Sequence, residues 1–411
     1  MIGENIAKGA AALAMALVCC TTTPALADDD DDKKGHLRIS GYVQGQFQWG
    51  QEDAELRVGT GNETPGQPFS RFGIRRGRLK ATYHRNVASA VVQIDVSTEK
   101  GVILKDAYID LREPWLHTFA LRAGVFNRPF GREIEVSSSE RETPERAHIF
   151  TTLFPDERDL GAMLMIQAPE DSPWHIMRLH AGLFAGNAAK QDNDSRKDFI
   201  GHLEFNHEWE ATDFELGAGV SYYHGFVYQG TESVYTMSSD GFAVSTSPYN
   251  KGRYAIRQYI GFDLYMEFDS VLGETEICGE YLFGRQPGSL TSSKSPNTVA
   301  LPASDTYIRP FRGGYVMLAH EIADTPIEIA LKYDIYDPNT LIAGNELGTK
   351  GTGITDAIRS AFGFGATWHI TDGMKITAYY DIVRNETSEN LAEAATDLRD
   401  NMFTLRLQYK F

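Results

Sequence analysis

Basic side chains recur at every second position of one short segment, as Arg76, Arg78 and Lys80. Leu79 and Ala81 occupy the positions beside them, an alternation that is typical of a β-strand with one polar and one apolar face. A row of cations on the polar face can select ions or steer polar solutes by charge. It can equally pair with acidic side chains and hold a neighbouring segment in place. The residues alone leave both interpretations open.

Bond-making chemistry has less support in the sequence. Nucleophilic hydrolysis needs a histidine beside a nucleophile and a carboxylate or amide, and the histidines show no repeated spacing to serine or aspartate. Residues 192–194, with Asp198, offer oxygen ligands for calcium, but they lack the glycine turn and distal glutamate of an EF-hand loop. We therefore predict no catalytic residues, no metal and no cofactor, and keep a barrel-embedded hydrolase as an alternative. The histidines considered are His84, His148, His180, His202, His224, His320 and His369.

The first residues of the chain indicate export. An apolar run over residues 10–20 is too short to span a bilayer as a helix, and an Ala-x-Ala cleavage pattern follows at residues 24–27. This arrangement predicts a secretory signal peptide over residues 1–27. An acidic periplasmic tail is expected over residues 28–36, followed by a membrane domain over residues 37–411.

Composition favours a membrane β-barrel over a bundle of membrane helices. The mean hydropathy is −0.33, and beyond the signal no stretch approaches the roughly 18 apolar residues that a spanning helix needs. Backbone groups in lipid must all be paired internally, so a closed barrel is the remaining solution. The net charge of −17 argues against nucleic acid as a partner.

Alternating segments predict an all-β transmembrane antiparallel barrel of about sixteen strands. An even number closes such a barrel with both termini on the periplasmic side. Short connections alternate with long ones, as in outer-membrane barrels, where short turns face the periplasm and long loops face outward. The predicted strands cover residues 37–50, 70–84, 87–97, 102–113, 117–127, 158–168, 174–184, 198–209, 212–225, 253–268, 273–284, 312–322, 326–337, 359–370, 373–386 and 401–411.

The final strand carries its own indication. Phe403, Leu405, Leu407, Tyr409 and Phe411 occupy alternate positions, so one face is apolar. A strand that ends on an aromatic residue resembles the closing strand of bacterial outer-membrane barrels. We therefore expect Phe411, with Tyr409, to act as the signal read by the barrel assembly machinery.

Six motifs, in their order along the chain, resemble the phosphate-selective porin O and P family. The resemblance covers essentially all of the chain after the signal peptide. The motifs are Phe72–Leu79 (FGIRRGRL), Lys105–Leu111 (KDAYIDL), Leu121–Gly131 (LRAGVFNRPFG), Arg158–Gly161 (RDLG), Gly182–Asn187 (GLFAGN) and Lys332–Pro338 (KYDIYDP).

The resemblance implies a sixteen-stranded homotrimeric channel whose long third loop folds inward and narrows the pore. In this chain that loop is 127–157. Phosphate-specific members line the narrowest section with arginine and lysine, whereas this loop has no lysine and carries several acidic residues. We expect these acids to face the basic row of Arg76, Arg78 and Lys80 across the pore. The loop residues predicted to contribute are Arg128, Arg132, Glu133, Glu135, Arg141 and Arg146.

The predicted function is that of an outer-membrane porin for passive diffusion of ions and small polar solutes, including anions such as phosphate. Expected partners are outer-membrane lipid and lipopolysaccharide, the barrel assembly machinery and further copies of the chain in a homotrimer. A structural or adhesive barrel with a closed lumen is the alternative, since the sequence does not give the pore radius.

Overall fold

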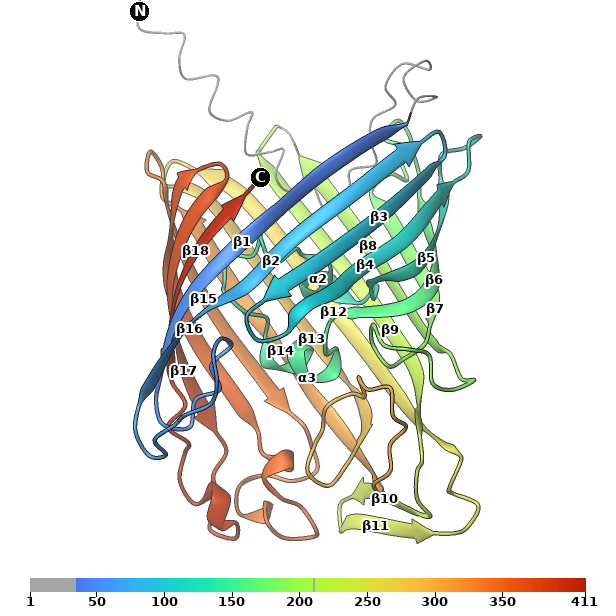
Figure 1. Ribbon diagram of the computed structural model, residues 1–411, viewed down its shortest axis with the longest axis vertical. Coiled ribbons are helices and arrows are strands. Elements are labelled where there is room, and N and C mark those ends of the chain that lie inside the picture. The colour runs from blue at the N-terminus through green and yellow to red at the C-terminus, as the bar shows by residue number, and fades with distance from the viewer. Residues whose placement is uncertain (1–34, 210) are drawn as a thin grey trace, which may run out of the picture.

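The computed structural model describes residues 35–209 and 211–411. The predicted signal peptide and residues 28–34 of the predicted acidic tail lie outside the described residues. Sixteen antiparallel strands form one closed barrel, in which each strand pairs with its neighbours in the chain and β1 pairs with β18 (Figure 1). This arrangement confirms the predicted fold class.

Every predicted strand has a counterpart in the barrel. Most ends agree to within three residues, and the largest difference is at β14, which begins six residues before the expected position. The barrel strands are β1 (His36–Gly50), β2 (Phe69–Arg85), β3 (Ala88–Ser97), β4 (Gly101–Arg112), β5 (Phe119–Asn127), β6 (Arg158–Gln167), β7 (Met177–Phe184), β8 (Asp198–Trp209), β9 (Phe214–Tyr228), β12 (Tyr254–Ser270), β13 (Gly273–Gly288), β14 (Thr306–Glu321), β15 (Ile327–Asp337), β16 (Arg359–Thr371), β17 (Met374–Asn385) and β18 (Met402–Lys410).

Alternation along the strands separates an outer apolar face from an inner polar face. In β18, Leu405 and Leu407 are exposed on the outside, whereas Arg406 between them is buried inside. In β14, Tyr315 points inward and Val316 points outward. A cation at the middle of the lipid face costs about 2–4 kcal/mol. Charged side chains within the strands therefore point inward, where they can line a water-filled lumen.

The seam between the first and last strands closes the barrel. Gly41 and Phe411 exchange two backbone hydrogen bonds, each 2.9 Å long, one residue beyond the β1–β18 ladder that starts at Tyr42 and Lys410. The Phe411 ring lies against Gly41, where a Cβ atom would approach it to 2.9 Å. The small residue on β1 thus leaves room for the terminal aromatic ring.

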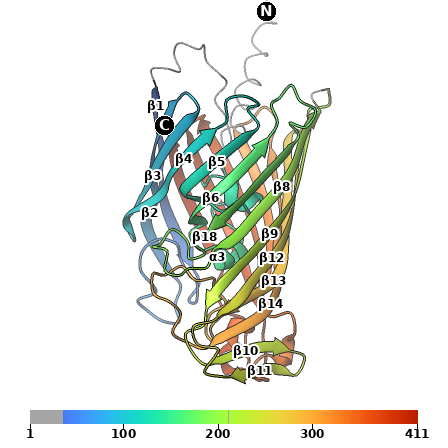
Figure 2. The ribbon, with the colours of Figure 1, turned by 90° about the vertical axis from the view of Figure 1, so that its right-hand side faces the viewer.

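The end of the barrel that carries the long loops holds structure that the sequence analysis did not predict. Residues 226–252, expected to be a loop, contain the hairpin of β10 (Ser233–Ser238) and β11 (Gly241–Thr246). Residues 234–236 of β10 pair in parallel with residues 306–308, which extends β14 beyond its expected start. Figure 2 shows this hairpin lying at the opposite end of the barrel from the C-terminus.

Short helices complete the described structure. Among the described residues, no helix has both the length and the apolar character needed to cross a membrane. Two lie in the loop between β5 and β6, and the 3-10 helices lie in the long loops after β15 and β17. The helices are α2 (Gly131–Glu135), α3 (His148–Leu153), η2 (Gly344–Glu346), η3 (Ile354–Asp356) and η4 (Ala392–Ala394).

Replacing Phe411 with aspartate should slow assembly of the barrel, because the substitution removes the aromatic ring that contacts Gly41 at the β1–β18 seam and puts a charge in its place. The measurement is the fraction of heat-modifiable, membrane-inserted protein after a pulse of synthesis. Phe411→Tyr, which keeps an aromatic ring, serves as the matched control and should assemble normally. Normal insertion of Phe411→Asp would contradict a role for this residue in assembly.

Candidate pore constriction

The loop between β5 and β6 contacts inward-facing side chains around much of the barrel. Residues 128–157 contribute α2 and α3, which both views show within the ring of strands (Figures 1 and 2). On one side the loop packs against an aromatic cluster on the inner wall. Phe150 lies 6.1 Å from Tyr315 between ring centroids, and Phe154 lies 5.7 Å from Tyr259. These rings form part of the largest buried apolar cluster among the described residues.

Polar contacts fix α2 to the same wall. The Gly131 backbone N–H donates to Ser221 Oγ at 2.9 Å, and the Glu133 carboxylate pairs with Lys332 and accepts from the Ala147 N–H. The Glu133 N–H donates to the carboxylate of Glu280. Gly131 has φ +62°, and a Cβ there would lie 1.9 Å from a Glu280 oxygen, so both the backbone and the space require glycine.

Three arginines meet one loop carboxylate on the opposite side. Arg75 donates two hydrogen bonds of 2.8 Å to Glu145, one to each oxygen. Arg76 and Arg406 each donate one more, at 3.0 and 2.8 Å. Burial raises the pKa of Glu145, but Arg75, Arg76 and Arg406 outweigh it and hold that pKa well below its usual range. Glu145 is therefore an anion at neutral pH.

A β-bulge brings Arg75 into this group. The pairing of β1 with β2 shifts at Gln44 and Gly45, so that Gln44 lies opposite Arg76 while Gly45 lies opposite Ile74. The extra residue, Arg75, is left out of the alternation and points inward beside Arg76. Two consecutive arginines thereby reach the same carboxylate.

The loop segment around Glu145 is also tied to β1 and β18 by amide and hydroxyl groups. Tyr42 and Ser138 share a hydrogen bond of 2.7 Å between their hydroxyls, and Gln44 donates to the Ser138 carbonyl at 2.9 Å. Gln408 donates to the Ser139 carbonyl at 2.9 Å. The loop therefore contacts both sides of the lumen, through aromatic rings on one side and charged and amide groups on the other.

Arg141 has a different environment from the other loop arginines. Its side chain is buried, at 7% exposure, and its three guanidinium nitrogens have no hydrogen-bond partner among the described residues. Burial, together with repulsion from Arg146, lowers the pKa of Arg141 to about 9. Arg75, Arg76 and Arg406 bond to one carboxylate, that of Glu145. Arg141 adds a fourth cation nearby and interacts electrostatically with both Glu145 and Glu133.

The remaining predicted site residues are distributed over separate ion pairs. We expected the loop acids to face Arg76 across the pore, but Arg76 forms a direct ion pair with Glu145 at 3.0 Å. Arg78 pairs with Asp95 on β3 at 3.3 Å, and Lys80 makes no ion pair among the described residues. The other pairs are Arg128 with Asp159 at 3.2 Å, Arg132 with Glu276 at 3.4 Å, Glu135 with Arg178 at 3.0 Å, and Arg146 with Glu157.

Sequence reasoning missed Arg75 and Arg406 as partners of the loop. The Arg75–Arg76 doublet was the available signal for the bulge, because strict alternation would send one arginine into lipid at a cost of about 2–4 kcal/mol. Arg406 is at a position of β18 whose side chain points inward. Its contact with Glu145, 261 residues earlier in the chain, forms only when the barrel closes. No local pattern reports that contact.

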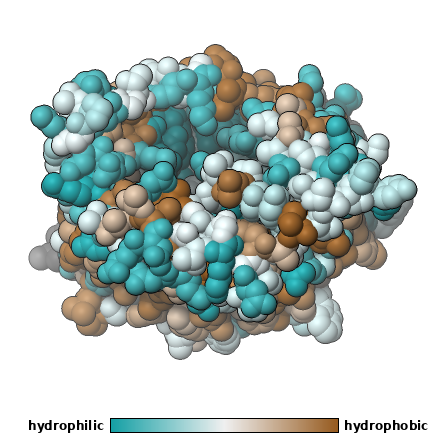
Figure 3. All heavy atoms as spheres, turned by 90° about the horizontal axis from the view of Figure 1, so that it is seen from below, coloured by the Kyte–Doolittle hydropathy of each residue, from teal (hydrophilic) through white to brown (hydrophobic). Residues whose placement is uncertain are grey.

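The barrel has two concave surface features. Seen from the end with the long loops, the molecule shows a recess bordered mostly by hydrophilic side chains (Figure 3).

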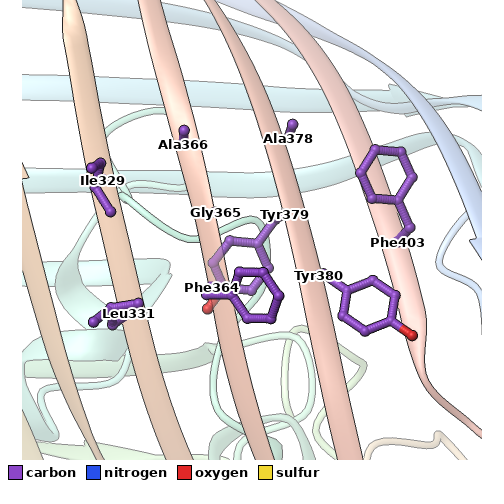
Figure 4. Close-up of a pocket in the computed structure, with 9 residues that line it drawn as sticks. All are labelled: Ile329, Leu331, Phe364, Gly365, Ala366, Ala378, Tyr379, Tyr380 and Phe403. Atoms are coloured by element: carbon purple, nitrogen blue, oxygen red, sulfur yellow. The ribbon is translucent and has the colours of Figure 1, made fainter.

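On the outer wall, a shallow apolar depression of about 380 Å³ forms where small residues leave space between larger ones (Figure 4). Its exposed members, Ile329, Leu331 and Phe364, belong to the outer apolar face of the barrel. It is lined by Ile329, Leu331, Phe364, Gly365, Ala366, Ala378, Tyr379, Tyr380 and Phe403.

A sixteen-stranded barrel with an inner loop and a polar lumen defines an outer-membrane porin, a channel of the bacterial outer membrane. The sequence matches the family described as phosphate-selective porin O and P over residues 42–411, and the chain belongs to that family. No curated protein matches the sequence.

Solved porin structures share the fold at low sequence identity. The anion-selective porin from Comamonas acidovorans is 10% identical, with a TM-score of 0.54, covering 92% of this chain and 100% of its own. The outer-membrane channel DcaP of Acinetobacter baumannii is 12% identical, with a TM-score of 0.54 and coverages of 92% and 97%. OprB of Pseudomonas putida is 8% identical, with a TM-score of 0.55 and coverages of 93% and 95%. At these identities the likeness concerns the fold alone.

Replacing Gly131 with alanine should loosen the loop, because the new methyl group meets Glu280 and the backbone becomes strained. We expect a lower thermal unfolding temperature and a larger single-channel conductance. Gly344→Ala is the matched control, since Gly344 also has a positive φ, +55°, but its added Cβ meets no atom within 4 Å. Equal effects of the two substitutions would contradict the Glu280 contact as the constraint on the loop.

Proposed function

We propose that this porin prefers anions and that the four arginines around Glu145 set the preference. The observation that carries the proposal is the local excess of cations: Arg75, Arg76 and Arg406 share one carboxylate, Glu145, and Arg141 lies nearby without a hydrogen-bond partner among the described residues. Charges at the narrowest section of a pore determine which ions enter it. An arginine fork also suits phosphate, which accepts two parallel N–H bonds.

Access to this group is through its partly exposed members. The side chains of Arg75 and Glu145 are 22% and 18% exposed, whereas Arg76 and Arg406 are almost fully buried behind them. An anion that reaches Arg75 would meet the field of all four guanidinium groups. Arg141, whose guanidinium has no hydrogen-bond acceptor within the part of the chain that the structure describes, adds to that field without being neutralised by a direct partner there.

The acidic character of the whole chain does not oppose this proposal. The net charge of −17 is spread over 411 residues. At physiological ionic strength the Debye length is about 8 Å, so a permeating ion responds mainly to the charges that line its immediate path. Local arginines can therefore attract anions within an acidic protein.

We also propose that transport, and not catalysis, is the role of this protein. Within residues 35–209 and 211–411, no histidine bridges a serine hydroxyl and a carboxylate. His202, for example, contacts two carboxylates, those of Asp263 and Glu135, at 3.0 and 3.8 Å. This arrangement lacks the nucleophile that covalent hydrolysis needs.

Export and assembly complete the proposal. Residues 1–27 would direct secretion, residues 28–36 would remain as a periplasmic tail, and the barrel assembly machinery would read Phe411 and Tyr409 during insertion. In the outer membrane, the exposed apolar face would contact lipid and lipopolysaccharide.

The charge proposal predicts the effect of removing Arg141. Arg141→Gln should raise the cation-to-anion permeability ratio roughly two- to fivefold, which corresponds to an interaction of about 0.5–1 kcal/mol. The measurement is the reversal potential across a planar bilayer with a KCl gradient. The shift should shrink near 1 M salt, where the Debye length falls to about 3 Å.

The control for this experiment is Arg384→Gln. Arg384 lies near the outer end of β17, is 63% exposed and pairs with Asp397. It should therefore change the ratio little. An unchanged ratio in Arg141→Gln, or equal shifts in the two variants, would contradict control of selectivity by the arginine group.

We further propose that the protein assembles as a homotrimer. Support comes from the family and from one side of the barrel wall, formed by β3 to β7, whose strands are short. These strands span eight to twelve residues, whereas β12 to β14 span sixteen or seventeen. Small residues such as Gly41 and Ala88 lie on β1 and β3, near this wall. Native mass measurement after mild detergent extraction should give three chains per particle. A strictly monomeric species would contradict the proposal.

A further inference from the structure

Three potential metal ligands lie together near the short-turn end of the barrel. Glu321, Glu328 and His369 come from the neighbouring strands β14, β15 and β16, and one ligand atom from each lies within 4.8 Å of the others. Glu321 and Glu328 are directly opposite each other in the β14–β15 pairing. His369 Nε2 lies 3.0 Å from one oxygen of Glu328. The barrel thus brings an imidazole and two carboxylates to one place on its inner wall.

Glu328 has unused binding capacity. Its side chain is 8% exposed, and its second oxygen, Oε1, has no hydrogen-bond partner among the described residues. A buried carboxylate oxygen without a partner is costly, because it has lost its water and gained nothing in return. A bound cation would satisfy it.

Nearby charges increase the need for a cation. Glu142 in the inner loop interacts electrostatically with Glu328 and adds a further carboxylate to this region. The two basic groups that act on Glu142 have other partners: Lys375 donates to the Arg141 carbonyl at 3.3 Å, and Arg132 pairs with Glu276 at 3.4 Å. Neither forms an ion pair with Glu328.

A second cluster of the same composition lacks these properties. Glu135, His202 and Glu204 also place their ligand atoms within 4.8 Å of one another. Arg178, however, donates to both glutamates and neutralises much of their charge. This cluster is therefore an ion-pair network, and it provides a natural control for the first one.

We propose that Glu321, Glu328 and His369 bind a divalent transition-metal ion of the Zn²⁺ type. Zinc accepts imidazole nitrogen and carboxylate oxygen at about 2.0–2.2 Å, and three protein ligands leave a position for water. Imidazole favours such ions over Mg²⁺ and Ca²⁺, which prefer oxygen ligands alone. The His369 side chain is 35% exposed, so an ion can reach the site from solvent. This proposal is independent of the ion selectivity of the channel.

The test is isothermal titration of ZnCl₂ into untagged, chelator-treated protein in detergent. We expect one saturable site per chain, weakened at least about tenfold by Glu328→Gln and by His369→Gln. Loss of even an outer-shell partner of a metal site typically costs about 10–100-fold in affinity, so loss of a ligand should cost no less.

His202→Gln is the matched control, because it removes the histidine of the second cluster and should leave zinc affinity unchanged. Heat-modifiable mobility checks that each variant is folded, and Glu321→Gln replaces any ligand variant that is not. The proposal is overturned if the wild-type protein has no saturable zinc site, if the ligand variants bind zinc as tightly as the wild type, or if His202→Gln alone removes the site.

Discussion

The contact between Glu145 and its three arginines determines how the interior of this porin is arranged. An isolated carboxylate in the lumen wall would be costly, and so would three adjacent guanidinium groups without an anion. Joined, they hold the inner loop against β1, β2 and β18 and leave a surplus of positive charge beside it. The same contact therefore sets both the position of the loop and the local field.

A different force holds the other side of the loop. Phe150 and Phe154 pack into an aromatic cluster on the opposite wall, where burial of apolar surface and edge-to-face ring contacts stabilise them. Gly131 allows α2 to approach Glu280 closely enough for the polar contacts there. The loop is thus attached to two opposite sides of the barrel wall, which limits how far it can move within the lumen.

Alternation predicted much of this architecture because lipid and water impose opposite demands on neighbouring residues. The apolar face of β18 followed directly from it, as did the inward position of Arg76. The bulge that turns Arg75 inward breaks the alternation, and its position depends on pairing with β1 that no local pattern reports. The hairpin of β10 and β11 was missed for a related reason, since its pairing with β14 joins segments about seventy residues apart.

The candidate site was predictable in its residue types but not in its partners. The basic row and the acidic loop were both visible in the sequence, yet the direct contacts of Arg76 and Arg406 with Glu145 depend on how the folded loop lies against β2 and β18. Contacts of this kind join residues that are far apart in sequence. The pattern of charges alone does not tell which basic side chain pairs with which acidic one.

The central claim is that the arginine group makes the narrowest section attractive to anions. The most direct measurement is the reversal potential of the wild-type channel in a planar bilayer with a tenfold KCl gradient at low ionic strength. The account predicts a potential whose sign shows chloride to be more permeant than potassium. A potential of the opposite sign, or a barrel that conducts no ions, would contradict it.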